Sequence, residues 1–70
     1  MMDSDLSEED LEARLAVVRQ DHADMDAAIH ALSHTALPDM MLIGRLKRKK
    51  LALKDEITRI EDLLTPDIIA

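Results

Sequence analysis

Two stretches of this chain carry their apolar residues at alternating steps of three and four, the spacing of a coiled-coil seam. The first stretch has seven seam positions: Leu11, Leu15, Val18, His22, Met25, Ile29 and Leu32. The second has seven more: Ile43, Leu46, Lys50, Leu53, Ile57, Ile60 and Leu64. A helix with one apolar stripe must bury that stripe. The sequence therefore predicts an all-α, coiled-coil-like antiparallel hairpin of two helices.

Folding the chain back near Leu37 pairs the two seams layer by layer. The predicted layers are Leu32 with Met40, Ile29 with Ile43, Met25 with Leu46, His22 with Lys50, Val18 with Leu53, Leu15 with Ile57 and Leu11 with Ile60. The only polar residues of the two seams, His22 and Lys50, thus share a layer. Asp26 lies one turn after His22 on the same helix. Because a polar pair in a seam fixes its register, we predict a structural polar layer of His22, Asp26 and Lys50.

Charged residues beside the seams test this register. Three predicted pairs attract: Asp21 with Lys49, Asp26 with Lys47 and Arg14 with Glu56. Two predicted pairs repel: Arg19 with Lys54 and Glu12 with Glu61. An exposed ion pair contributes only ~0.2–1 kcal/mol, so the balance supports the register without proving it.

The predicted single domain spans residues 1–70. Its parts are a tail at 1–6, a helix at about 7–34, a turn at about 35–39, a helix at about 40–64 and a tail at 65–70. Ser7 followed by Asp10 has the spacing of a capping box at a helix start. The second helix starts either with Pro38 in its first turn or with Asp39 as its N-cap, and the sequence does not separate these alternatives.

Gly44, the only glycine, falls inside the second predicted helix. Three interpretations are open. The glycine is tolerated at a cost of ~1 kcal/mol, it permits a close backbone approach, or the helix begins only after it.

Composition narrows the function classes. The 70 residues include no cysteine and no aromatic residue, and the formal net charge is −6. No thiolate chemistry is available, and a small domain without disulfides is typical of the cytoplasm. The start of the chain is acidic and does not resemble a signal peptide, and no apolar run is long enough to cross a bilayer. A two-helix scaffold also offers no enclosed pocket, so we expect neither enzymatic activity nor a cofactor.

The histidines suggest two specific chemistries. Protonation of His22 beside Lys50 would repel that ammonium and loosen the hairpin, as in a pH switch. Asp26, His30 and His34 are spaced by four and share one helix face, as metal ligands do, but a fourth ligand is missing. Structural roles are the simpler interpretation, and we expect no metal site.

A basic run in the second helix is the candidate anion-binding surface. Its residues are Arg45, Lys47, Arg48, Lys49 and Lys54, together with the seam residue Lys50. Lysine and arginine on a helix can bind phosphates in a salt-dependent manner. The absence of aromatic side chains for base stacking and the acidic net charge make a solvated face the simpler interpretation. Nucleic-acid binding is disfavoured but stays open.

Several apolar residues lie outside the seams. The larger ones are Val17, Leu42, Leu51 and Leu63. A two-helix unit buries little apolar surface on its own, so we predict that these residues form an oligomer surface in a homodimer or a larger helical bundle. The leading functional hypothesis is therefore a self-associating module that binds protein chains, and the alternative is a protein that binds nucleic acid or another anionic surface. A third hypothesis is a subunit whose fold forms only with a larger protein partner.

Two blocks of the sequence resemble the YdcH-like family of small bacterial proteins. The first is His22-Ala-Asp-Met25-Asp26-Ala-Ala-Ile29; the second runs from Leu46 to Ile57 as LKRKKLALKDEI. Arg48 stands where the family usually has lysine, and the connection carries Leu37-Pro38 in place of the usual glycine and polar loop. The resemblance implies a bacterial cytoplasmic helical hairpin of uncharacterised role, and it implies no catalytic residues.

Overall fold

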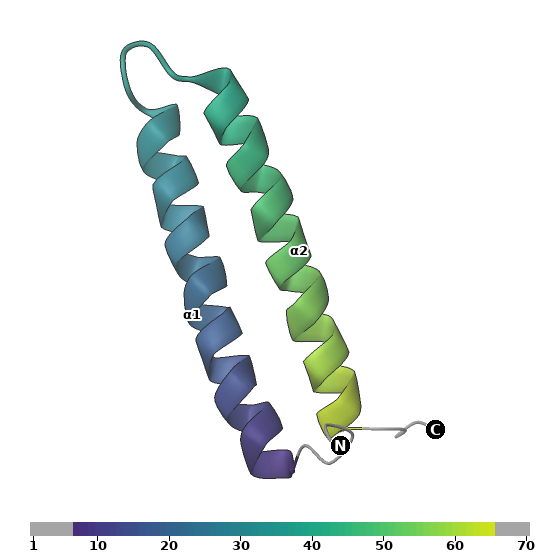
Figure 1. Ribbon diagram of the computed structural model, residues 1–70. Coiled ribbons are helices and arrows are strands. Elements are labelled where there is room, and N and C mark those ends of the chain that lie inside the picture. The colour runs from purple at the N-terminus through teal and green to yellow at the C-terminus, as the bar shows by residue number, and fades with distance from the viewer. Residues whose placement is uncertain (1–6, 66–70) are drawn as a thin grey trace.

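The computed structural model describes residues 7–65, which form two helices joined by a short loop. Helix α1 spans Glu8–Ser33 and helix α2 spans Met40–Leu64. The helices run antiparallel and pack against each other along their length (Figure 1). The predicted all-α hairpin is therefore confirmed. The tail predicted at 1–6 lies outside the described residues, as does all of the tail predicted at 65–70 except Thr65.

Side-chain caps define where both helices begin. The Ser7 hydroxyl accepts a hydrogen bond from the Asp10 amide at 3.1 Å, and the Ser7 amide donates to the Asp10 carboxylate at 3.5 Å. This is the predicted capping box. Asp39 Oδ1 accepts from the Leu42 amide at 3.0 Å. Asp39 is therefore the N-cap of α2, and Pro38 precedes the cap instead of opening the helix.

Gly44 lies inside α2, so the late helix start is wrong. A methyl group at this position would meet no atom within 4 Å. Within the hairpin, no close approach therefore requires glycine, and the residue is tolerated in an open position.

Burial follows the predicted seams. Six residues are buried: Leu15, Val18, Ile29, Ile43, Ile57 and Ile60. The other eight seam positions are half-buried: Leu11, His22, Met25, Leu32, Leu46, Lys50, Leu53 and Leu64. All fourteen seam positions thus face the partner helix, and every buried residue in the part of the chain that the structure describes belongs to a seam.

The core is concentrated at the end of the hairpin opposite the loop. Leu15, Val18, Ile57 and Ile60 form one buried cluster, and Leu11, Leu53 and Leu64 pack against it. Ile29 and Ile43 are buried nearer the loop, outside this cluster. Between these sites the seam residues are only half-buried.

The cross-helix ion pairs correct the predicted register. Arg14 bonds Glu56 at 2.7 Å, as predicted. Arg19, however, bonds Glu61 at 2.6 Å and does not face Lys54. Met40 is 67% exposed, so the predicted layer of Leu32 with Met40 is also wrong.

The direction of helical side chains explains this displacement. Side chains lean toward the N-terminus of their own helix, so in an antiparallel pair they lean in opposite directions. This lean joins some α1 side chains to α2 residues further along the chain than their backbone level suggests, as Arg19 is joined to Glu61, while Arg14 keeps its predicted partner Glu56.

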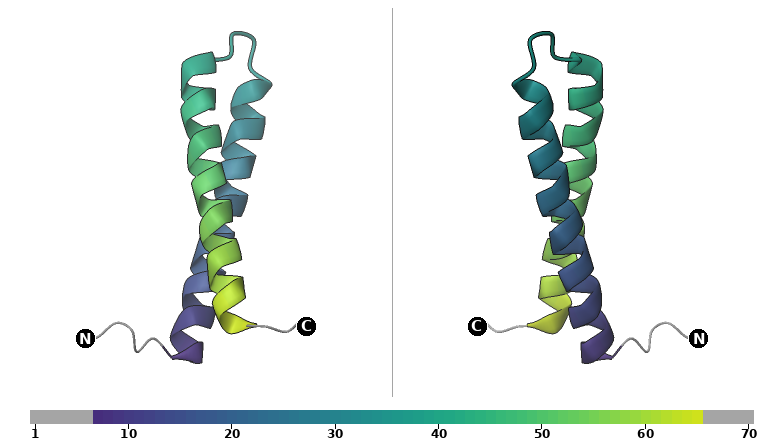
Figure 2. Two further views of the ribbon diagram at one scale, coloured as in Figure 1. Left: turned by 90° about the vertical axis from the view of Figure 1, so that its right-hand side faces the viewer. Right: turned by 90° about the vertical axis from the view of Figure 1, so that its left-hand side faces the viewer.

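The hairpin is one helix thick. Its smallest dimension is 16 Å, little more than the 10–12 Å diameter of a single helix with its side chains. The side views show the two helices crossing at an angle, with no third layer on either face (Figure 2). Among residues 7–65, each helix therefore has one neighbouring helix, and no other described element covers either face of the pair.

Candidate functional site

An ion pair in the middle of the hairpin occupies the site of the predicted polar layer. Lys50 Nζ donates to Asp26 Oδ1 at 2.6 Å, so Asp26 pairs with Lys50 instead of Lys47. The hydrogen bond and the charge of Lys50 lower the pKa of Asp26 below its ordinary value of 3.8, and the nearby His22 and His30 lower it further. Lys50 is half-buried while Asp26 is exposed, as expected for a lysine that extends from a seam to the surface.

His22 is half-buried beside this ion pair. Its charge acts on Asp26, yet no hydrogen bond joins its ring to Lys50 among residues 7–65. His22 and Lys50 thus both lie near the carboxylate of Asp26. This arrangement does not test whether protonation of His22 acts as a pH switch, and the switch stays a prediction.

The other two histidines pack against each other at the end of α1. The ring centroids of His30 and His34 lie 4.3 Å apart, and His34 Nδ1 lies 2.8 Å from the carbonyl oxygen of His30. Within the described part of the chain, no group of three or more histidine and acidic side chains could hold a metal ion.

A hollow of about 500 Å³ opens between the helices on one face of the hairpin, which we call the groove face. Its lining residues are Asp21, Asp24, Met25 and Ala28 from α1, and Lys49, Ala52, Leu53 and Glu56 from α2. Four of the lining residues are apolar and four are charged, so the hollow combines apolar surface with both signs of charge.

Heptad spacing extends the groove face along the hairpin. Leu42 and Leu63 lie seven residues from Lys49 and Glu56, so these four residues form one row along α2. Val17 lies seven residues before Asp24 on α1. The groove face therefore carries three of the four predicted oligomer residues. Leu51, the fourth, lines a separate hollow with Ile29, Lys47 and Lys50.

Three of these four apolar residues are more than half exposed. The exposed fractions are 54% for Val17, 66% for Leu51 and 60% for Leu63, while Leu42 is half-buried. The hairpin itself does not cover them, and their role as an oligomer surface remains a prediction.

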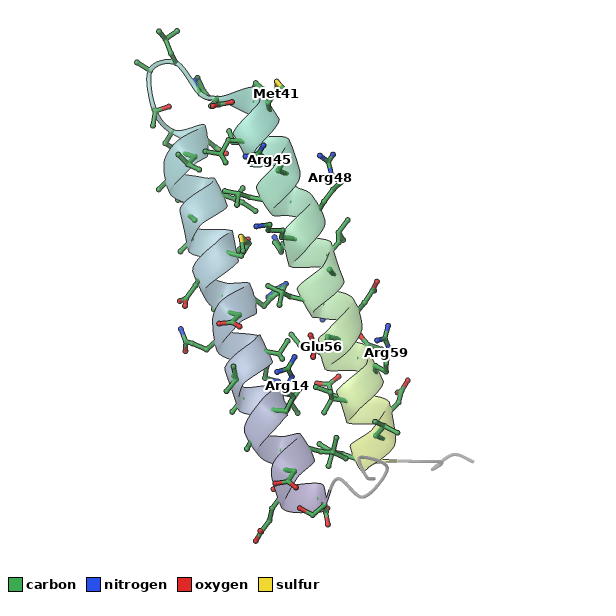
Figure 3. The ribbon with its side chains drawn as sticks, viewed as in Figure 1. Arg14, Met41, Arg45, Arg48, Glu56 and Arg59 are labelled. Carbon is green, nitrogen blue, oxygen red and sulfur yellow. The ribbon has the colours of Figure 1, made fainter. Side chains whose placement is uncertain are left out.

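The candidate anion-binding residues are all exposed on α2. They are Arg45, Lys47, Arg48, Lys49 and Lys54. Between residues 7 and 65, the cations in ion pairs are Arg14, Arg19 and Lys50, and none of these five takes part. Arg48 projects from α2 away from α1, whereas Arg14 and Glu56 meet between the helices (Figure 3).

An apolar patch at the loop end was missed by the sequence analysis. Leu37, Met40 and Met41 are among the most exposed large apolar residues of the described chain. Met41 marks the start of α2 in Figure 3. The sequence did indicate exposure for two of these residues, because Leu37 precedes a proline in the predicted turn and Met41 lies outside the seam. Met40 was instead paired with Leu32 in a seam layer.

One family model matches residues 15–61, with the description "Protein of unknown function (DUF465)". The chain belongs to this family. The match covers both blocks that resemble the YdcH-like proteins, which belong to the same family, and the resemblance is confirmed. Neither the search of curated proteins nor the search of solved structures gave a match.

Neither helix described here combines the length and the apolar character needed to cross a bilayer.

Proposed function

We propose that this protein is a self-associating helical hairpin that acts by binding other protein chains, including its own copies. In this proposal it works in the cytoplasm and has no catalytic activity. One observation carries the proposal: the hairpin leaves eight seam positions half-buried while large apolar residues outside the seam stay exposed.

The physical reason is the shortage of buried surface in one layer of two helices. Small chains bury a smaller fraction of their surface, and short domains compensate with disulfides, metals or association. The chain has no cysteine, and residues 7–65 hold no metal-ligand group. Association with further helices is the remaining means of stabilisation.

Sedimentation equilibrium combined with circular dichroism tests this proposal. Across nanomolar to high micromolar concentrations, we expect the average mass to reach at least twice that of one chain and the helical signal to rise with it. A fully helical monomer throughout this range would contradict the proposal.

The unpaired cations of α2 support a second candidate function, binding to an anionic surface. Arg48→Glu is compared with Arg59→Glu, since both side chains project from α2 in Figure 3 and Arg59 lies outside the basic run. Anion binding predicts retention on heparin that falls as salt rises and that Arg48→Glu weakens more than Arg59→Glu. No retention at low salt would eliminate this candidate.

A further inference from the structure

We propose that a second copy of this chain packs on the groove face, related by a two-fold axis parallel to the helices. In this dimer, α1 of each copy lies on α2 of the other, and both loops lie at the same end. The inference rests on the proposed self-association and specifies its surface and symmetry.

Small residues and exposed apolar residues favour the groove face over the opposite face. Ala28 and Ala52 line the hollow together with Met25 and Leu53, and their small side chains permit close approach of another helix. The opposite face has charged residues at three of the four positions of each heptad row next to the seam. The charged residues are Glu12, Arg19 and Asp26 on α1, and Lys47, Lys54 and Glu61 on α2, and the fourth positions are Ser33 and Met40 at the loop end. Packing against that face would desolvate both charged rows.

Charge placement selects the symmetry. On the groove face, α1 presents Asp21 and Asp24, while α2 presents Lys49 and Glu56 at the same hollow and Arg45 one turn before Lys49. Glu56 is already paired with Arg14 of its own hairpin, whereas Lys49 and Arg45 have no ion-pair partner among residues 7–65. A two-fold axis parallel to the helices places each α1 against the partner's α2, so Asp21 and Asp24 meet Lys49 and Arg45. An axis across the helices places α1 against α1, so the aspartates of the two copies meet at the hollow. Like-charge contacts oppose association, and the parallel axis is therefore favoured.

Arginine substitutions of exposed alanines test the surface. Ala28→Arg and Ala52→Arg place a long cation in the groove, while Ala23→Arg and Ala27→Arg make the same change outside the groove face. We expect the first two variants to weaken dimerisation at least tenfold in sedimentation while helix remains at high concentration, and the second two to dimerise like the natural chain.

The possible failures are distinguishable. If the natural chain stays monomeric, both the proposed function and this inference are wrong. If the natural chain self-associates and Ala23→Arg or Ala27→Arg disrupts it while the groove variants do not, self-association stands and the groove face is wrong.

A spin-label distance tests the symmetry. The chain lacks cysteine, so Ala36→Cys gives one labelling site in the loop. The loop lies about 12 residues from the hollow, or about 18 Å at 1.5 Å per residue. Loops at the same end predict label separations of roughly 10–20 Å, set by helix spacing and the label tethers. A two-fold axis across the helices would separate the loops by about 36 Å, and that distance would overturn the inference.

Discussion

One end of the seam and its middle differ in how well they are packed. At the end opposite the loop, Leu15, Val18, Ile57 and Ile60 form a buried cluster. In the middle, His22, Met25, Leu46 and Lys50 are only half-buried, and Met25 and Lys50 each line an open hollow. Both regions obey the same heptad spacing, so spacing decides which residues face the partner helix, and side-chain type decides how completely they are buried.

Side-chain chemistry explains the difference. The terminal cluster uses compact aliphatic side chains, which fill the space between two helices without polar atoms. The middle has a lysine that extends out to Asp26, a histidine and a flexible methionine, flanked by alanines that cover little of the seam. The middle is therefore the region that another chain would complete.

The largest expected effect comes from truncating the packed end. Ile57→Ala removes a buried side chain and should cost ~2–5 kcal/mol of unfolding free energy. Met25→Ala, at a half-buried position beside the hollow, should cost clearly less. Urea unfolding at one fixed chain concentration measures both, and equal losses would contradict the difference between the two regions.

The stability of the start of α2, at the loop end, depends on its N-cap Asp39. Asp39→Ala removes the acceptor for the Leu42 amide and should cost about 1 kcal/mol. Asp39→Ser keeps a capping oxygen and is the matched control. Thermal unfolding should place the serine variant close to the natural chain; if both variants lose the same stability, the cap does not stabilise α2.

Replacing the polar seam residue should make the middle more like the packed end. Lys50→Leu adds apolar surface at a half-buried position and loses an exposed ion pair, for a net gain below about 1 kcal/mol. Chemical unfolding at fixed concentration measures the change. A clear loss of stability would show that the ion pair holds the middle together.

The smallest effect is the acid dependence of the Asp26 ion pair. Because Lys50 lowers the pKa of Asp26 in the folded chain, the pair stabilises the fold above the ordinary pKa of 3.8. This stabilisation is lost as the pH falls through the lowered folded pKa. Asp26→Asn should remove that part of the acid slope in unfolding experiments from pH 7 downward. An unchanged slope would show that the pair does not contribute.

The seams, the hairpin and the Ser7 capping box followed from the sequence because they depend on periodicity and local hydrogen bonds. Two of the charged pairs did not, because they depend on how side chains lean between antiparallel helices. Arg19 pairs with Glu61, about two turns along α2 from Lys54, and Asp26 pairs with Lys50, about one turn from Lys47. The groove face was only partly foreseen. Val17, Leu42 and Leu63 were identified as apolar residues outside the seam, but the hollow depends on the unequal sizes of neighbouring side chains.

Hydrogen exchange at two chain concentrations distinguishes a packed end that is stable within one hairpin from a middle that a second copy completes. We expect amides around Val18 and Ile57 to be the slowest to exchange at both concentrations, and amides around Met25 and Lys50 to exchange more slowly at the higher concentration. Equal protection along both helices, unchanged by concentration, would show that the two regions do not differ and that no second copy covers the middle.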